Sequence, residues 1–162
     1  MELQQIPLTA LAGVQIGHAQ DEAAATGCTV FLLGAEGAPA GLDVRGGGPA
    51  SRESELLKPL AAAGAIHAIL LSGGSAFGLD AAGGVMRYLE ENGIGFDTGY
   101  ARVPLVCQAD LYDLSLGSAA VRPDAAMAYA ACQDAARSTW RGGNVGAGAG
   151  ASVGKPCGME RA

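Results

Sequence analysis

Charged and aromatic residues are scarce in this 162-residue sequence, at 16% and 5% of the chain. Acidic residues outnumber Lys and Arg by 16 to 10, which gives a net charge of −6 at pH 7. The basic residues are scattered singly and form no stripe. Because a surface that binds nucleic acid normally carries clustered Lys and Arg, we expect no nucleic-acid partner.

Long hydrophobic runs are also missing. No uninterrupted apolar stretch reaches the roughly 18 residues that a membrane-spanning helix requires. The N-terminal segment lacks the basic and hydrophobic regions of a secretion signal. We therefore expect no membrane partner and a cytoplasmic location.

Cysteine and histidine are too few and too dispersed for a metal site. The four cysteines, Cys28, Cys107, Cys132 and Cys157, contain no CxxC pair, and there are only two histidines. Metal sites normally bring such ligands together at short spacings. We expect no metal and no other cofactor, and we interpret the cysteines as buried, reduced thiols.

Glycine, by contrast, is abundant, with 26 residues. The clusters at 46–48, 73–74, 83–84, 142–143 and 146–154 predict tight turns and close backbone approach. The last cluster runs into Lys155 but is not a Walker A loop. Ala149 stands where that motif has its first glycine, and Pro156 replaces the hydroxyl residue that holds magnesium.

The order of the elements favours an α+β fold. Segments 14–18 and 26–33 are rich in β-branched and aromatic residues and predict strands, and 38–44 could form a third strand in a hairpin with the second. The apolar run 65–71 predicts a strand buried on both faces. A helix is expected over 76–91, with Phe77, Ala81, Val85 and Leu89 on one face. Short strands are expected at 94–96 and 103–107, and a second helix begins at Pro123-Asp124.

Three positions invite a functional interpretation, each with a structural alternative. Ser75 follows a predicted strand, but Phe77 stands where the G-x-S-x-G nucleophile elbow requires glycine, which favours a turn or helix-cap serine. Lys155 is the only cation in a run of small residues, so it is either a desolvated base or a surface lysine. Tyr112 is either a core aromatic or a hydrogen-bond donor in a site.

Five stretches, in order along the chain, together resemble the L-aminopeptidase/D-esterase family, which includes β-peptidyl aminopeptidases and nylon-oligomer hydrolases. They are DVRGGGPASRESELL (43–57), HAILLSGGSAFGLDAAGGVMRYLEENGIGFD (67–97), ARVPLVCQADLYDL (101–114), VRPDAAMAYAAC (121–132) and GNVGAGAGASVGK (143–155).

The resemblance implies an α+β fold of the αββα four-layer sandwich type, similar to N-terminal-nucleophile hydrolases. Members of the family are made as one precursor that cleaves itself into an α and a β chain, and the new N-terminal Ser or Thr is the nucleophile. Residues 1–162 would be the N-terminal part of the α chain of a single peptidase domain. The cleavage site and the nucleophile would lie beyond Ala162, and the 162-residue chain alone is expected to be inactive.

The resemblance also implies roles for individual residues. Tyr112 matches a tyrosine that helps to hold the tetrahedral intermediate, and Lys155 matches a lysine that lines the cleft in the nylon-hydrolase branch. The turn Gly73, Gly74 and Ser75 is a candidate for binding substrate. The expected partners are a small peptide or amide substrate, the β chain of the same precursor, and further copies in a homo-oligomer.

Two alternatives to the hydrolase stay open on sequence alone. The first is a degenerate or truncated, non-catalytic homologue that acts as a binding or structural module through an exposed sheet edge. The second is a small-molecule binder whose glycine loops hold an anion.

Overall fold

A computed structural model describes residues 3–4, 6–137 and 141–158. Its strands are β1 (Gln15–Asp21), β2 (Thr26–Leu32), β3 (Ala50–Arg52), β4 (Ala68–Ser72), β5 (Phe96–Asp97), β6 (Arg102–Val103) and β7 (Val106–Asp110). Its helices are α1 (Ala82–Glu91) and α2 (Ala125–Ala136), with 3-10 turns η1 (Leu8–Ala10), η2 (Ser54–Leu57), η3 (Ser75–Ala81), η4 (Gly146–Gly150) and η5 (Lys155–Cys157).

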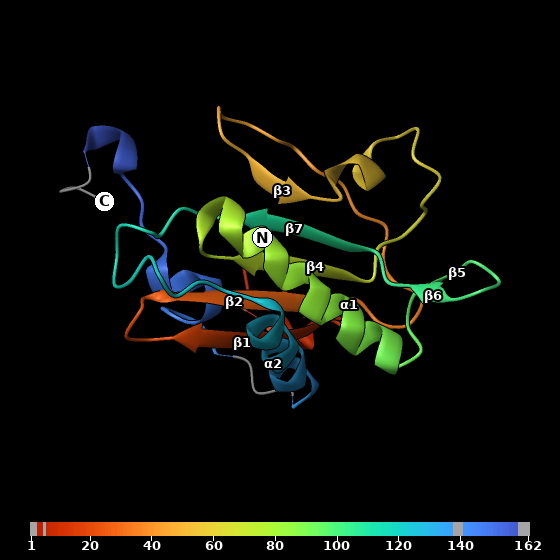
Figure 1. The fold of residues 1–162 in the computed structure, drawn as a ribbon. Helices are drawn as coiled ribbons and strands as arrows, with labels where there is room; N and C mark the ends of the chain where they lie inside the picture. Colours follow the sequence, from red (N-terminus) through yellow and green to blue (C-terminus); the bar gives the residue numbers. More distant parts are fainter. Residues whose placement is uncertain (1–2, 5, 138–140, 159–162) are drawn as a thin grey trace.

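One five-stranded sheet forms the centre, in the order β1-β2-β4-β7-β3 (Figure 1). The pair β4 and β7 is parallel, and the other neighbouring pairs are antiparallel. Strands β5 and β6 form a separate two-stranded hairpin. The parallel pair gives β4 and β7 a shared carboxyl end, from which the functional segments emerge.

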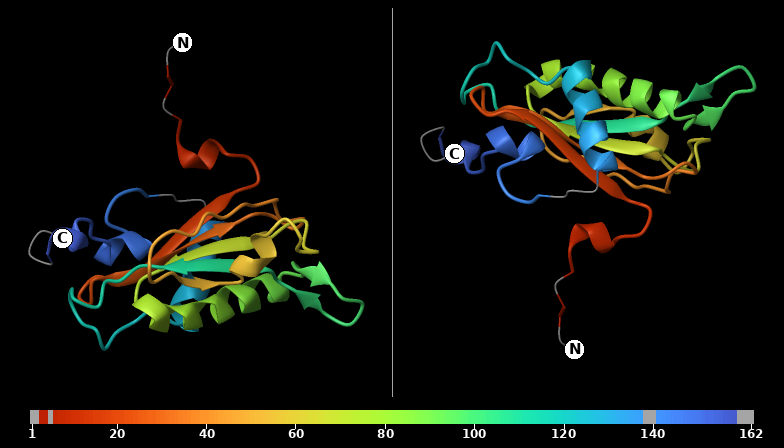
Figure 2. Two further views of the ribbon diagram at one scale, coloured as in Figure 1. Left: turned by 90° about the horizontal axis from the view of Figure 1, so that it is seen from above. Right: turned by 90° about the horizontal axis from the view of Figure 1, so that it is seen from below.

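Both α-helices lie on one face of the sheet, which we call the covered face (Figure 2). Alternate residues of β2 and β4, including Cys28, Val30 and Leu70, are fully buried there. The helices approach closely because the contacts are made by small residues. A Cβ on Gly17 of β1 would overlap the backbone of Ala131 in α2. Glycine is therefore required at that position by packing.

The opposite face, which we call the open face, carries the other set of alternating side chains. His18, Thr29, Leu71 and Ala109 form one row across it, each paired in register with the next. Leu71 is 37% exposed, whereas its neighbour Leu70 on the covered face is fully buried. Within the described chain, the open face has no α-helix on it.

The helix ends follow the sequence signals. The Asp124 side chain accepts a hydrogen bond from Met127 N at 2.8 Å, which satisfies one free amide of the first turn of α2. Helix α1 ends at Glu91, its C-cap is Asn92, and Gly93 follows with φ 70°. The predicted stop of α1 is confirmed, whereas α2 begins at Ala125, just after the predicted start, so Pro123 lies outside the helix.

Three expectations about elements are wrong. Residues 38–44 form no strand, only an isolated bridge from Ala38 to Ile66, and the third strand is β3. The strand predicted at 65–71 is buried on one face only, since Leu71 is partly exposed. The predicted helix over 76–91 starts as the 3-10 segment η3, and its Phe77 points outward and packs under the Arg122 guanidinium, 3.7 Å from the ring centroid.

The described chain is thus a mixed α+β structure, as the order of elements predicted. Its main part is the five-stranded sheet with one helical layer on it, and the β5–β6 hairpin is a separate small sheet. Neither α-helix in the described part of the chain has the length and hydrophobicity needed to cross a lipid bilayer.

Candidate functional site

The segments that leave the carboxyl ends of β4 and β7 are joined by backbone hydrogen bonds. Ser75 N donates to Leu111 O at 3.0 Å, and Leu111 N donates to Ser72 O at 2.9 Å. Gly74 (φ 83°) and Ser75 (φ 54°) both have left-handed backbone conformations. For a serine this conformation is strained, and such strain is often found at functional sites.

A buried carboxylate, Asp113, fixes this turn. Its Oδ1 accepts a hydrogen bond from Gly74 N at 2.7 Å, and its Oδ2 accepts one from the Thr26 hydroxyl at 2.7 Å. Asp113 is 2% exposed. The position of Gly73 explains why no side chain is tolerated there, because a Cβ would overlap Asp113 Oδ2. Sequence reasoning missed Asp113, since a single aspartate in a loop carries no spacing signal.

The backbone N–H groups of the predicted substrate-binding turn are all used in hydrogen bonds within the chain. The amide of Gly73 donates to Gly27 O at 2.9 Å, and those of Gly74 and Ser75 donate to Asp113 and Leu111. These three N–H groups are committed within the chain. A role for Gly73, Gly74 and Ser75 in binding substrate stays a prediction, and it would have to use other atoms, such as the Ser75 hydroxyl.

Tyr112 lies between Leu111 and Asp113, directly beside this turn. Its side chain is 49% exposed, so it is not the core aromatic of the structural alternative. The Tyr112 hydroxyl has no hydrogen bond to any group in the described part of the chain. The phenol is therefore available to a ligand, although its catalytic role stays a prediction.

Lys155 begins η5, directly after Gly154, whose φ is 90°. Its ammonium donates to Ser152 O at 2.7 Å, and the residue is partly buried. This contact is local, and the structure does not bring Lys155 into a hydrogen bond with Tyr112. Its role in a cleft also stays a prediction.

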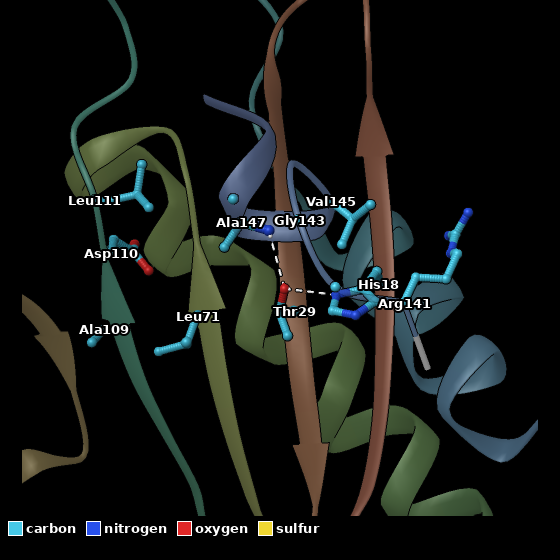
Figure 3. Close-up of a pocket in the computed structure, with 12 residues that line it drawn as sticks. His18, Thr29, Leu71, Ala109, Asp110, Leu111, Arg141, Gly143, Val145 and Ala147 are labelled. Atoms are coloured by element: carbon cyan, nitrogen blue, oxygen red, sulfur yellow. Dashed lines mark hydrogen bonds between the residues drawn. The ribbon is translucent and has the colours of Figure 1, made fainter. Parts of the chain in front are cut away.

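A cavity of about 460 Å³ opens on the open face, between the row of strand side chains and the glycine-rich loop 142–148. Figure 3 shows Thr29 at its centre, with His18 on one side and Leu71 and Ala109 on the other. The remaining lining residues are Asp110, Leu111, Arg141, Gly142, Gly143, Val145, Ala147 and Gly148. Its volume is typical of small-molecule sites.

His18 and Thr29 connect the sheet to this loop. The Thr29 hydroxyl accepts a hydrogen bond from Ala147 N at 3.1 Å and lies 3.0 Å from His18 Nδ1. The His18 backbone amide donates to Asp134 Oδ2 at 2.9 Å. Burial lowers the pKa of His18, although the Arg141 backbone and the Asp134 carboxylate act in the opposite direction. The lowered pKa favours the neutral form of the His18 imidazole.

Asp110, the last residue of β7, lies on the other wall of the cavity. Burial raises the pKa of its carboxyl to about 7, and the charge of Asp113 adds to the effect, while a hydrogen bond from Gln108 opposes it. Its Oδ1 accepts from Gln108 Nε2 at 2.8 Å. Its Oδ2 is buried without a hydrogen-bond partner among the described residues and lies towards Gly78 of η3.

Cys28, Cys107 and Cys132 are buried as expected, whereas Cys157 is exposed. Burial raises the pKa of the Cys28 and Cys132 thiols to about 12, so neither is a nucleophile at neutral pH. His67 Nδ1 accepts a hydrogen bond from Leu105 N at 3.0 Å, which uses its ring to hold a strand end. Within the described ranges, no three His, Cys, Asp or Glu side chains gather to bind a metal ion.

The fold and site together place the chain in the α+β class, with polar side chains at the carboxyl ends of a parallel strand pair. The chain belongs to peptidase family S58, whose sequence model matches residues 7–158. This finding confirms the resemblance described from the sequence motifs.

Relatives with assigned names point the same way. The chain is 41% identical over 161 residues to an uncharacterized aminopeptidase of Mycobacterium leprae, covering 91% of this chain and 44% of the relative. It is 42% identical over 134 residues to an uncharacterized aminopeptidase of Mycobacterium tuberculosis, covering 77% of this chain and 38% of the relative. It is 38% identical over 143 residues to a 6-aminohexanoate-oligomer endohydrolase of a Kocuria species, covering 88% of this chain and 38% of the relative. The chain thus spans less than half the length of these relatives.

Proposed function

We propose that this chain is the N-terminal, α-chain part of a self-cleaving hydrolase that acts on short peptides, amides or esters. The observation that carries the proposal is the match to a peptidase family over residues 7–158. The relatives are named as aminopeptidases and as an oligomer endohydrolase. Hydrolysis is the chemistry that these names share.

The nucleophile in this proposal is an N-terminal Ser or Thr supplied by sequence beyond the 162 residues printed here. Its own α-amino group can serve as the base. Tyr112 supports the proposal because it is half exposed, its hydroxyl has no hydrogen bond within the described chain, and the next residue, Asp113, bonds to the turn at Gly74. A phenol in such a place can donate to the oxygen that becomes negatively charged in the transition state.

Lys155 would act through its charge. A compact ammonium close to the scissile carbonyl would stabilise developing negative charge, and near the nucleophile it would lower the pKa of the α-amino group that serves as the base. The ammonium is held by one backbone carbonyl, Ser152 O, so it keeps hydrogen-bonding capacity for other groups.

The open face suggests how the rest of the protein is arranged. The proposal places a second sheet and its helices over this face, which gives the αββα sandwich that the resemblance implies. The β chain of the same precursor would supply those layers, and αβ units would assemble into a cytoplasmic homo-oligomer. The partly exposed Leu71 supports this arrangement, because apolar sheet faces are normally covered.

The test is Lys155→Ala in the full-length protein, with Lys58→Ala as the matched control. Lys58 is an exposed lysine directly after the 3-10 turn η2, and among the described residues its ammonium forms an ion pair with Glu55 alone. Lys155→Ala is expected to impair hydrolysis of an aminoacyl p-nitroanilide and also cleavage of the precursor, while Lys58→Ala leaves both unchanged. Lys155→Arg should restore activity only in part, since a planar guanidinium does not replace a compact ammonium.

Two measurements on one preparation decide the result. A denaturing gel shows precursor against α and β chains, and a rate assay shows turnover. Normal chains and a normal rate in Lys155→Ala would remove Lys155 from the site. A wild-type full-length protein that neither cleaves itself nor hydrolyses any amide or ester would instead support the non-catalytic homologue.

A further inference from the structure

Asp113 lies where three segments that are distant in the sequence meet. Its side chain is 2% exposed. One carboxyl oxygen accepts from Gly74 N in the turn after β4, and the other accepts from the hydroxyl of Thr26, the first residue of β2. Both donor–acceptor distances are 2.7 Å, so both bonds are well formed. In the described part of the chain no Lys or Arg forms an ion pair with Asp113, so these two donors hold the carboxyl group.

The third segment is η4, whose last residue, Gly150, packs directly on Asp113. A Cβ on Gly150 would lie 2.8 Å from Asp113 Cβ and 2.9 Å from its Oδ2, and it would also overlap the carbonyl oxygen of Ala25. Carbon atoms that are not bonded to each other lie about 3.5–4.0 Å apart at their optimal separation. Glycine is therefore the residue that leaves room for the carboxyl group, and the backbone of η4 rests on the Asp113 side chain.

Two of these segments lead to the candidate catalytic residues. Tyr112 directly precedes Asp113, and Lys155 begins η5, shortly after η4. Figure 1 shows the teal segment after β7 and the blue η4–η5 segment on the same side of the molecule, beyond the carboxyl ends of β4 and β7, and the views in Figure 2 agree. Because Asp113 contacts both segments, its side chain connects the chain around Tyr112 to the loop that precedes Lys155.

We propose that Asp113 is a positioning residue, which holds the Tyr112 segment and the η4 loop before Lys155 in one fixed arrangement at the carboxyl edge. Asp113 acts through these two segments and does not itself contact the substrate. This role goes beyond holding the turn at Gly74, because it makes the order of the η4 loop depend on Asp113. The effect on turnover rests on the proposed hydrolase function, whereas the connection between the segments does not.

Amide hydrogen exchange of the full-length protein, followed by mass spectrometry, measures the connection without a substrate. Asp113→Ala should speed exchange at least about 10-fold in peptides that cover 73–75 and also in those that cover 146–151, because both segments then open locally more often. Amides of the second segment donate hydrogen bonds within the chain, for example Ala147 N to the Thr29 hydroxyl at 3.1 Å, so their exchange reports the order of η4. A role confined to the turn would speed exchange in 73–75 alone.

The control is a loss of stability in another part of the fold. Ile66 is 1% exposed and lies just before β4, at the opposite end of that strand from the turn at Gly74. Ile66→Val and Ile66→Ala remove a small and a larger part of the same buried side chain, so their stabilities should bracket that of Asp113→Ala. Well below the unfolding temperature, neither control should speed exchange selectively in 73–75 and 146–151.

Thr26→Val is a milder variant for the case in which Asp113→Ala does not fold. It removes one of the two donors to the carboxyl group and keeps a side chain of nearly the same shape in β2. The exchange of both segments should then increase by a smaller factor than in Asp113→Ala.

Turnover measures the consequence for catalysis. A displacement of about 1 Å at a catalytic group can slow a reaction about 100-fold. Asp113→Ala is therefore expected to lower kcat about 100-fold and Thr26→Val about 10-fold, each with KM within about twofold of wild type. Asp113→Asn should recover part of the loss, because its side-chain oxygen can still accept from Gly74 N. The Ile66 variants should keep the wild-type kcat.

The proposal is overturned if faster exchange in Asp113→Ala, or in Thr26→Val where that variant is needed, is confined to 73–75. It is also overturned if an Ile66 variant of equal stability changes the same two segments, or lowers kcat as much. A protein that shows the change in both segments but hydrolyses nothing would refute only the hydrolase. A hydrolase whose segment 146–151 is unaffected by loss of the carboxyl group would refute only the positioning role.

Discussion

The two faces of the central sheet are built from the same strands but from different kinds of contact. On the covered face, small and apolar residues such as Cys28, Val30 and Leu70 are fully buried against α1 and α2. On the open face, His18 and Thr29 hold polar contacts to a glycine-rich loop beside a cavity. The covered face therefore carries the stability of the fold, and the open face with its carboxyl edge keeps polar groups available for ligands.

The largest effect should come from adding one methyl group to the covered face. In Gly84→Ala the new Cβ would overlap the carbonyl of Ala125 at the start of α2, and a rigid backbone cannot move aside. We expect the free energy of unfolding to fall by more than about 3 kcal/mol, which is a large part of the stability of a typical domain. Urea unfolding followed by circular dichroism measures it.

The neighbouring glycine is the control for that change. A Cβ on Gly83 meets no atom within 4 Å, although it lies in the same helix. Gly83→Ala should therefore raise the free energy of unfolding by about 0.5–1 kcal/mol, because alanine is the better helix former. Equal effects of the two substitutions would show that close packing against α2 is not what requires Gly84.

The second prediction concerns the carboxyl edge, where function rather than stability should change. Tyr112→Phe in the full-length protein is expected to lower kcat about 100- to 1,000-fold with little change in KM, since an oxyanion donor contributes about 2.7–4 kcal/mol. Tyr100→Phe is the control, because Tyr100 is 99% exposed. A kcat within twofold of wild type in Tyr112→Phe would make Tyr112 a surface tyrosine without a catalytic role.

The third prediction tests Asp113, whose carboxylate joins the turn at Gly74 to Thr26 of strand β2. Asp113→Ala leaves the amide of Gly74 and the hydroxyl of Thr26 without their acceptor. We expect a loss of about 2–3 kcal/mol in the free energy of unfolding, as is typical when buried donors lose a charged partner. Asp113→Asn should lose less, because its amide oxygen can still accept one of the two bonds. Thermal and urea unfolding of both variants would distinguish them, and an unchanged stability of Asp113→Ala contradicts the assignment.

Part of the fold could be predicted from the sequence alone. The α+β class, β1, β2, α2 and the C-terminal end of α1 follow from local signals such as Pro123-Asp124 and the Asn92-Gly93 stop. The third strand could not be placed, because β3 has three residues and is defined by pairing with β7, which is distant in the sequence. Short apolar runs such as 65–71 also do not reveal whether one face or both are buried.

The sequence also identified only some of the residues of the candidate site. Motifs drew attention to Tyr112, Lys155 and the turn at Gly73, and the structure places that turn beside Tyr112. Asp113 and the pair formed by His18 and Thr29 were missed as a site, because their importance arises from contacts between strands and loops far apart in the sequence. Single polar residues in a strand carry no spacing pattern, so only the fold identifies them.

The last and smallest effect is a pH dependence at the edge of the cavity. Burial raises the pKa of Asp110 from an ordinary 3.8 to about 7 in the folded protein. At a pH below the ordinary pKa of 3.8, the Asp110 carboxyl is protonated in both the folded and the unfolded chain, so it does not change the free energy of unfolding. As the pH rises towards 7, the unfolded chain ionises first, so stability falls between about pH 4 and pH 7 and is then constant.

Replacing the carboxyl with a neutral amide should remove this decline. Asp110→Asn keeps an oxygen for the bond from Gln108 and has no charge to bury. Three pKa units correspond to about 4 kcal/mol, but Asp110 retains some contact with solvent, so we expect a gain of only about 1–2 kcal/mol at pH 8 and none at pH 4. Urea unfolding at both pH values measures the difference, with the exposed Asp43→Asn as control. A gain of the same size at both pH values would mean that packing, rather than a buried charge, accounts for the effect.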